Sequence, residues 1–242
     1  MDNNLKMILQ KQCQMSIGRF KDRVLYRTPW ATRSILMSEG FAFCAVADFL
    51  DVDAIFESGI YNGRSTQMWA NYFPLEVNIV AIDKRDFRRA ATNRLAPYKN
   101  VTLLRGNGPT ELNKLIAKFP EKRIGIFMDG PKGRRGVGFG KEALKKSNVV
   151  MVAIHDMSKI KGNEVTDGRP EFETWEMSKF LTEEEWFVKE YSWLDTEESQ
   201  YDSGQKLTWH PYIIVSGKGK EFDRKLGSYG PTIGFAFSWG GE

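Results

Sequence analysis

Six polar residues follow short apolar segments in the middle of this 242-residue chain, and their types suit ligand binding and proton transfer. A carboxylate can accept hydrogen bonds from two neighbouring hydroxyl groups, and carboxylates together with an imidazole can hold a divalent cation. A histidine, or a lysine whose pKa is lowered, can take a proton from a hydroxyl group. The six residues are Glu57, Asp83, Asn107, Asp129, His155 and Asp156.

The sequence AIFESGIYNGRSTQMWA at 54–70 predicts a buried strand, a glycine turn and a helix. Gly59 and Gly63 permit backbone conformations or close approaches that other residues do not. Ser65 or Thr66 would lie in the first helical turn, where backbone N–H groups lack intrahelical partners. The spacing is neither the GxGxxG of a dinucleotide site nor a phosphate loop ending in GK[ST]. The turn indicates a nucleotide-type α/β site, with an ordinary tight turn that binds nothing as the alternative.

The middle of the chain alternates between strand-like and helix-like segments. Strands that alternate with helices predict a mostly parallel, doubly wound α/β sheet with helices on both faces. Right-handed crossovers bring the carboxyl ends of these strands to one edge, where open α/β sheets bind ligands. We therefore expect the six polar residues to lie along that edge. The predicted strands are 54–56, 77–82, 101–104, 123–128 and 149–154, and the predicted helices are 86–95, 110–119 and 140–146.

The N-terminal part of the chain precedes the first predicted strand and shows helical spacing. Leu5, Ile8 and Leu9 repeat at helical intervals, and residues 35–50 give a second helical pattern. Thr28 and the proline after it mark a break between the two helices. We interpret 1–50 as a helical extension or lid, and 51–242 as the α/β domain.

The C-terminal part follows a different pattern from the alternating middle. Residues 171–181 predict a helix, whereas the aromatic and β-branched runs 186–193 and 209–215 predict two strands. These two strands should form an antiparallel hairpin at the sheet edge, which brings the predicted sheet to seven strands. Residues 227–242, rich in glycine and aromatic residues, should form a short strand or pack over the surface.

The composition is that of a globular protein, with 41% hydrophobic and 27% charged residues and a formal net charge of +4. The sequence has no apolar run of about 20 residues, as a membrane span would need, and residues 1–14 lack the apolar core of a signal peptide. Its two cysteines, Cys13 and Cys44, provide no paired framework, which favours a reducing compartment. We expect a cytoplasmic protein that does not bind a membrane.

Residues 53–156 resemble the class I S-adenosylmethionine (SAM)-dependent methyltransferases, and residues 171–217 resemble them more loosely. In that family an acidic residue that ends the first strand is followed by Gly-x-x-x-Gly, as in ESGIYNG at 57–63. The resemblance implies a Rossmann-like fold with SAM as the cofactor. It also implies that the cofactor contacts come from Glu57, Gly59, Tyr61, Gly63, Ser65, Asp83, Asn107 and Asp129.

Two of these residues match family positions with stated roles. Asp83 corresponds to the acid that ends the second strand and binds the ribose hydroxyls. Asn107 follows a glycine where the family usually has Gly-Asp near the adenine, a departure that keeps hydrogen bonding but loses a charge. The GRST sequence at 63–66 resembles the small-molecule and sugar O-methyltransferase branches.

The end of the fourth predicted strand resembles the catechol-type O-methyltransferases. Asp129 and Lys132 match an Asp-x-x-Lys motif in which the aspartate binds a divalent cation and the lysine helps to deprotonate the acceptor hydroxyl. Where that group has an Asp-Asn pair after the fifth strand, this chain has His155 and Asp156. The resemblance thus implies Asp129, His155 and Asp156 as metal ligands, with Mg²⁺ or a softer cation. Lys132 or, alternatively, His155 would be the catalytic base.

These observations favour an enzyme that methylates a hydroxyl of a small molecule or sugar, because it needs only to align an activated methyl group with the acceptor. An RNA methyltransferase is an alternative, since Arg88, Arg89, Arg134 and Arg135 could contact phosphates. A third is a relative of the fold that binds the cofactor without catalysis, or has neither function. A dehydrogenase is disfavoured because the turn after the first predicted strand lacks the GxGxxG motif of a dinucleotide site. A homodimer is the expected assembly.

Overall fold

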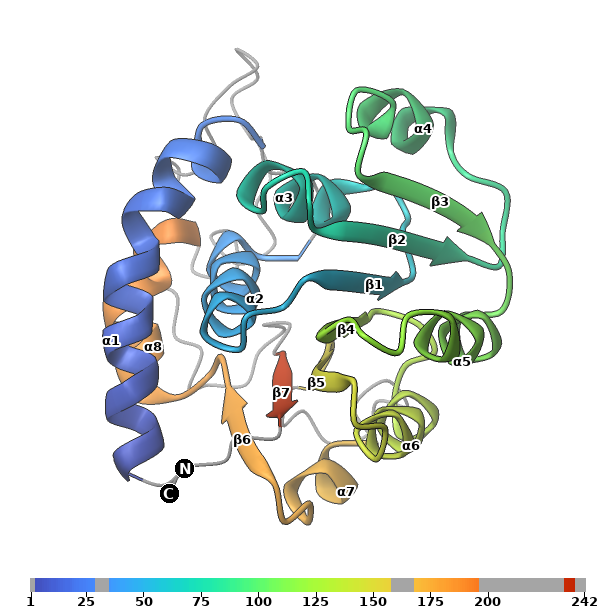
Figure 1. Ribbon diagram of the computed structural model, residues 1–242. Helices are drawn as coiled ribbons and strands as arrows, with labels where there is room; N and C mark the ends of the chain where they lie inside the picture. The colour runs from blue at the N-terminus through green and yellow to red at the C-terminus, as the bar shows by residue number, and fades with distance from the viewer. Residues whose placement is uncertain (1–2, 29–34, 158–167, 196–232, 238–242) are drawn as a thin grey trace, which may run out of the picture.

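The computed structural model describes residues 3–28, 35–157, 168–195 and 233–237 of the chain (Figure 1). The strands are β1 (Ala54–Ser58), β2 (Asn78–Asp83), β3 (Val101–Arg105), β4 (Ile124–Met128), β5 (Val149–Ile154), β6 (Ser178–Leu181) and β7 (Gly234–Phe237). The helices are α1 (Asn3–Phe20), α2 (Met37–Phe49), α3 (Arg64–Tyr72), α4 (Arg89–Leu95), α5 (Gly108–Lys118), α6 (Arg134–Ala143), α7 (Arg169–Glu173) and α8 (Glu185–Tyr191). A π-helical turn (Lys21–Leu25) extends α1, and a 3₁₀ turn (Ser192–Asp195) follows α8.

The strands form one seven-stranded sheet in the order β3-β2-β1-β4-β5-β7-β6. β1 pairs in parallel with β2 and β4, and parallel pairing continues to β3 on one side and to β5 on the other. β7 is antiparallel to both β5 and β6. The predicted Rossmann-like, mostly parallel sheet with an antiparallel pair at its edge is therefore confirmed.

The chain reverses its direction across the sheet at β1. From β1 it proceeds outward to β2 and β3, and β4 then returns to the other side of β1 and continues to β5. In an open α/β sheet the connections after the two central strands diverge at such a point, and a crevice opens at their carboxyl ends. The topology thus locates the expected ligand site at the ends of β1 and β4.

Two apolar layers hold the helices against the sheet. Ile55 and Phe127 face the layer formed with α1, α2, α3 and α8, whereas Phe56 and Ile126 face the layer formed with α5 and α6. Successive residues of a strand point to opposite faces. β1, β4 and β5 are buried throughout, as a parallel sheet covered on both faces requires.

The helices predicted within residues 1–50 are present and share the core of the sheet. α2 lies between α1 and the sheet (Figure 1), and the rings of Phe20 and Phe41 pack edge to face with their centroids 5.3 Å apart. α2 is buried along nearly its whole length, including the polar residues Ser38 and Glu39. The division into an extension and a domain at residue 50 stays a prediction.

The predictions for the C-terminal part were partly wrong. The helix predicted over 171–181 is replaced by the short α7 and by β6, and the strand predicted over 186–193 is helical. Trp186, Phe187 and Tyr191 suit a strand by type, but Phe187 and Tyr191 are four residues apart and pack on one helical face, with ring centroids 5.1 Å apart. The predicted strand 209–215 lies outside the described residues. The antiparallel edge pair is instead β6 with β7. β7 lies within 227–242, so the first of the two alternatives for that segment, a short strand, is the one observed.

The helix predicted over 140–146 begins earlier, since α6 starts at Arg134. Glycines oppose helix formation, so Gly136 and Gly140 weakened the sequence signal. They are required by packing, because a Cβ on Gly136 would lie 2.3 Å from the Pro131 carbonyl oxygen and one on Gly140 would lie 3.0 Å from Val152. The starts of the other helices differ from the prediction by a few residues.

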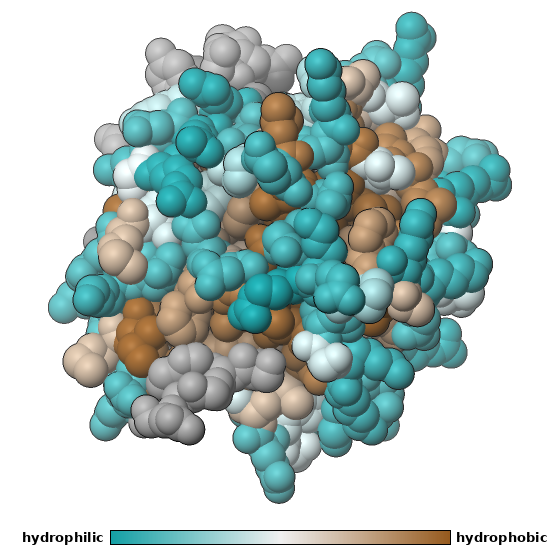
Figure 2. All heavy atoms as spheres, viewed as in Figure 1, coloured by the Kyte–Doolittle hydropathy of each residue, from teal (hydrophilic) through white to brown (hydrophobic). Residues whose placement is uncertain are grey.

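The surface carries few large apolar side chains among the described residues. Hydrophilic residues dominate the outline of the face in Figure 2, with hydrophobic residues showing between them. The exposed large hydrophobic residues are Met7, Met15, Tyr26 and Leu75. Within the described part of the chain, no helix has the length and apolar character to cross a bilayer.

Candidate functional site

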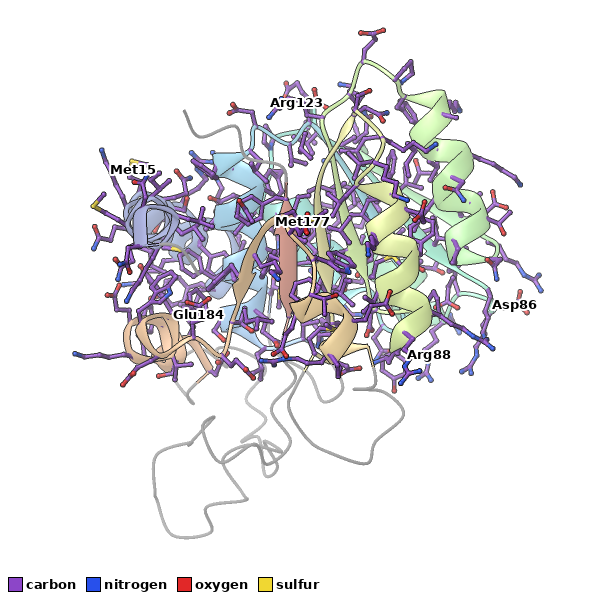
Figure 3. The ribbon with its side chains drawn as sticks, turned by 90° about the horizontal axis from the view of Figure 1, so that it is seen from below. Met15, Asp86, Arg88, Arg123, Met177 and Glu184 are labelled. Carbon is purple, nitrogen blue, oxygen red and sulfur yellow. The ribbon has the colours of Figure 1, made fainter. Side chains whose placement is uncertain are left out.

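A pocket of about 730 Å³ lies at the carboxyl ends of β1, β2 and β4, and loops that follow these strands line it. This volume lies within the range of about 300–1,000 Å³ that is typical of small-molecule sites. Arg88, which follows β2, lies at the opposite end of the sheet from Arg123, which precedes β4 (Figure 3). Of the predicted cofactor residues, the pocket wall includes Gly59, Tyr61, Asp83, Asn107 and Asp129.

The glycine turn after β1 combines two left-handed backbone conformations with close packing. Gly59 has φ 99°, and a Cβ there would lie 3.1 Å from the backbone carbonyl carbon of Asp129. Gly63 has φ 71°, and a Cβ there would lie 2.9 Å from Leu95 of α4. Gly59 therefore lets the loops of β1 and β4 meet under the pocket. Gly63 is outside the pocket wall and serves the packing of α4, so its cofactor contact stays a prediction.

Glu57 and Ser65 lie behind the pocket wall rather than in it. The Glu57 side chain is fully buried and accepts hydrogen bonds from the hydroxyls of Ser65 and of Thr66, the latter at 2.6 Å. Burial, with Asp129 adding to it, raises the pKa of Glu57 to about 7 although the two hydroxyls oppose the shift. This arrangement ties β1 to the start of α3 and so fixes the glycine turn.

We expect Glu57→Gln to remove a pH dependence of stability. The pKa of Glu57 is higher in the folded than in the unfolded protein, so the protonated side chain stabilises the fold. This contribution is complete below about pH 4.5 and is lost as pH rises to about 7. The wild type should therefore lose up to about 3 kcal/mol relative to the variant across this range. Urea unfolding of both proteins at pH 5 and pH 8 measures the difference. If the two proteins differed by the same unfolding free energy at pH 5 and at pH 8, the raised pKa of Glu57 would be wrong.

Asp83 is held in place by the backbone of the pocket wall. Its Oδ2 accepts the N–H of Ile60 at 3.2 Å, and its Oδ1 accepts the N–H of Arg85 at 2.9 Å. The first bond joins the end of β2 to the glycine turn after β1. Each carboxylate oxygen retains a second lone pair, so the side chain can also accept from a bound diol.

Asn107 begins α5 at the other side of the pocket. Its side-chain oxygen accepts the N–H of Thr110 at 3.3 Å and so caps the helix. Because the cap uses the oxygen, the amide nitrogen is the group that a ligand could meet. The cap accounts for the position of Asn107 at the pocket wall, although an aspartate would cap the helix equally well.

Arg88 is a pocket residue that the sequence did not single out for this role. Its guanidinium lies over the Tyr61 ring, 3.9 Å from the ring centroid. Tyr61 has a φ of 48°, a left-handed backbone conformation that is uncommon for residues other than glycine. The sequence signal for Arg88 was only a cluster of basic residues after β2, and such clusters are common on solvated surfaces.

A compact group of charged residues follows the ends of β4 and β5, and we name it the β4–β5 cluster: Asp129, Lys132, His155 and Asp156. The Nδ1 of His155 lies 3.0 Å from Asp129 Oδ1 and 3.3 Å from Asp156 Oδ1. The Nζ of Lys132 lies 3.0 Å from Asp129 Oδ1 and also bonds Asp156. The structure therefore brings together all the residues that the sequence predicted for catalysis and metal binding. Three of these residues, Asp129, His155 and Asp156, each offer one possible metal-ligand atom. These three atoms lie within 4.8 Å of one another.

The charges of the β4–β5 cluster stabilise one another. Burial alone would lower the pKa values of His155 and Lys132, but the carboxylates of Asp156 and Asp129 outweigh it and raise both. Burial would raise the pKa values of the two aspartates, but His155 and Lys132 outweigh it and lower both. Two cations thus face two anions, and neither basic residue is an available base until it loses a proton.

Lys132 and His155 differ in their access to the pocket. The Lys132 side chain is 39% exposed and forms part of the pocket wall, whereas the His155 side chain is 10% exposed and lies outside the wall. A general base must reach the proton that it removes. Geometry therefore favours Lys132 over His155 for contact with an acceptor in the pocket.

Glu39 of α2 is a second residue that the sequence did not indicate. It is fully buried, and its Oε2 lies 3.7 Å from the Nε2 of His155. The signal that could have found it is an acidic residue among the mostly apolar residues of the helix predicted over 35–50, which also contains Asp48. Without the fold, nothing in the sequence connects this position to His155.

Comparison with known proteins gives similarity at the level of structure. No protein-family model matches the chain, and no curated protein matches it significantly. The structure resembles a proposed O-methyltransferase from Klebsiella pneumoniae, with 13% identity, a TM-score of 0.53, and coverage of 94% of this chain and 90% of that one. It also resembles the Bacillus cereus O-methyltransferase in complex with SAH, with 12% identity, a TM-score of 0.51, and coverage of 94% and 91%.

A third solved structure extends this pattern. It is the O-methyltransferase TomG from Streptomyces achromogenes, involved in tomaymycin synthesis and solved in complex with SAM. The identity is 15%, the TM-score is 0.50, and the match covers 95% of this chain and 89% of that one. The described sheet and helices of this chain therefore have the fold of the class I SAM-dependent methyltransferases.

Proposed function

We propose that this chain is a SAM-dependent methyltransferase that methylates a hydroxyl group of a small molecule or sugar. The observation that carries the proposal is one pocket whose wall includes the backbone-held Asp83 together with Asp129 and Lys132 of the β4–β5 cluster. The first suits a ribose diol, and the second suits a hydroxyl group that must lose a proton. The fold shared with SAM-dependent O-methyltransferases supports the same assignment.

The residues of the pocket fit the proposed cofactor. Gly59, Asp83 and Asn107 line one pocket of about 730 Å³, and the missing side chain of Gly59 lets its backbone lie against that of Asp129 in the wall. Asp83 would bind the ribose hydroxyls, and the amide of Asn107 would meet the adenine side. SAM, when bound, supplies a methyl group that is already activated on a sulfonium. The protein then has to hold the acceptor in line and to take up the proton that its hydroxyl releases.

The β4–β5 cluster fits a divalent cation by its donor set. Asp129, His155 and Asp156 offer two carboxylates and one imidazole within 4.8 Å of one another, and Lys132 already lies as a cation on the same carboxylates. A bound cation would lower the pKa of an acceptor hydroxyl. The imidazole favours metals that accept nitrogen ligands, such as Mn²⁺ or Zn²⁺, over Mg²⁺.

Titration with SAM by calorimetry tests the proposal. The wild type should bind with micromolar affinity, about −8 kcal/mol. Asp83→Ala should weaken binding by about 1–3 kcal/mol, because it removes charge-assisted hydrogen bonds to the ligand.

The matched control is Glu76→Ala, which removes an exposed carboxylate near the opposite end of β2. This variant should bind SAM like the wild type. Absence of binding to the folded wild type would overturn the proposed function. Equal affinity in folded Asp83→Ala would remove Asp83 from the cofactor site.

Methylation of a phosphate-bearing acceptor such as RNA is a second candidate function. Five basic and three acidic residues line the pocket. Among the described residues, four of the basic ones have no carboxylate partner, and they are Lys84, Arg85, Arg88 and Arg135. RNA binding that weakens steeply with added salt would favour this candidate, whereas salt-insensitive turnover of a neutral acceptor would exclude it.

A further inference from the structure

Glu39 and His155 form a buried contact in which both residues have an unused polar atom. The Oε2 of Glu39 accepts the N–H of Leu36 at 2.9 Å and lies 3.7 Å from His155 Nε2. Within the described residues, neither Glu39 Oε1 nor His155 Nε2 has a hydrogen-bond partner. Buried polar atoms without partners are rare in folded proteins and require an explanation.

The opposite side of the same imidazole faces the pair of aspartates. His155 Nδ1 lies 3.0 Å from Asp129 Oδ1 and 3.3 Å from Asp156 Oδ1. A cation held by these two carboxylates would therefore meet Nδ1 and not Nε2. A neutral imidazole carries one N–H, so a lone pair at Nδ1 requires the proton to be on Nε2.

We propose that Glu39 is a positioning residue, which accepts the Nε2–H of His155 and so directs the Nδ1 lone pair toward Asp129 and Asp156. A charge-assisted hydrogen bond is about 2.8 Å long, so the present separation of 3.7 Å must shorten when the imidazole donates to Glu39. Partners of this kind fix the tautomer and orientation of metal-binding histidines. The inference rests on the metal-assisted part of the proposed function.

A purely structural role for Glu39 would be the capping of α2. Its bond to the N–H of Leu36 belongs to that role. However, a second buried acid already serves the same helix end, because Asp195 accepts the N–H of Ser38 at 2.8 Å and its hydroxyl at 2.6 Å. Asp195→Asn is therefore a matched control, since it removes a buried charge from the start of α2 at a different residue.

The chain has only two histidines, His155 and His210, so a His210→Gln protein has one imidazole. In this protein, with ¹⁵N-labelled histidine and bound Zn²⁺, NMR should show the proton on Nε2 and none on Nδ1. Adding Glu39→Gln should shift the Nε2 resonance and lower the Zn²⁺ affinity by about 10–100-fold. Adding Asp195→Asn should leave both at their original values. None of these measurements needs SAM or turnover.

The inference would be overturned if Glu39→Gln left the Zn²⁺ affinity unchanged, or if the Zn²⁺-loaded protein carried its proton on Nδ1. It would also be overturned by an equal loss of affinity in Asp195→Asn, which would indicate a general effect of α2. No Zn²⁺ binding by the single-histidine protein would overturn it together with the metal site. SAM titration of the same protein then shows whether the methyltransferase proposal fails as well.

Discussion

Replacing Lys132 with methionine should lower kcat by about 10²–10⁴-fold, the range for loss of a general base. Methionine keeps a long unbranched side chain but cannot accept a proton. Lys132 lines the pocket and is 39% exposed, whereas His155 is nearly buried, so the lysine has the better access to an acceptor hydroxyl. The affinity for SAM should remain close to that of the wild type, because the change lies on the acceptor side.

The pH profile separates a basic from a structural role for Lys132. The carboxylates of Asp129 and Asp156 raise its pKa, so the lysine must lose a proton before it can act, and kcat should rise with pH. Lys132→Met should lose this rise. Lys145→Met is the control, since Lys145 is an exposed lysine paired with Glu142 at 2.6 Å and lies outside the pocket.

Two further results would contradict the assignment of Lys132. If a chelator leaves turnover unchanged while His155→Ala abolishes it, the histidine is the base and the metal is not used. If Lys132→Met turns over like the wild type, Lys132 belongs with the solvated charges of its loop. Either result would leave the cofactor site at Asp83 unaffected.

The sequence predicted the sheet well because its signals were local. β1, β2, β4 and β5 each contain an apolar run, and parallel strands buried on both faces require such runs. Once the strands alternate with helices, right-handed crossovers bring their carboxyl ends together. This is why Asp129, His155 and Asp156, which come from two separate turns, could be predicted to meet.

The sequence failed where tertiary packing overrides local preference. The aromatic residues of α8 resemble a strand by composition, but Phe187 stacks on Phe41 of α2 with ring centroids 6.4 Å apart. Glycines in α6 obscured a helix that needs them for close packing against Pro131 and Val152. Contacts such as Glu39 with His155 join positions more than 100 residues apart, and no spacing rule reports them.

The charge balance of the β4–β5 cluster explains why its residues act as a unit. Asp129 Oδ1 lies 3.0 Å from both Lys132 Nζ and His155 Nδ1, so one oxygen serves two cations. Asp156 contacts the same two residues from the other side. Each cation therefore depends on both carboxylates, and effects of single substitutions here should be strongly non-additive.

Replacing Asp129 with asparagine should lower kcat by about 10²–10³-fold, as the loss of one preorganised electrostatic group does. Asparagine keeps the shape of the side chain but removes the charge shared by Lys132 and His155. It also removes one of the two carboxylates that would hold a cation, so Mn²⁺ or Zn²⁺ affinity should fall in parallel. Binding of SAM should be nearly intact, because the proposed role of Asp129 is on the acceptor side.

The matched control is Asp53→Asn, because Asp53 precedes β1 and so lies at the opposite end of the strands from the pocket. Asp53 accepts the N–H of Arg123 at 2.9 Å, so this variant loses a carboxylate of comparable structural use far from the pocket. It should retain kcat, SAM affinity and metal affinity. If Asp129→Asn instead loses SAM affinity as much as kcat, the carboxylate acts on the cofactor, as its place in the pocket wall beside Gly59 also allows. If the variant keeps both, the charge at Asp129 only offsets that of Lys132, and the reaction does not use it.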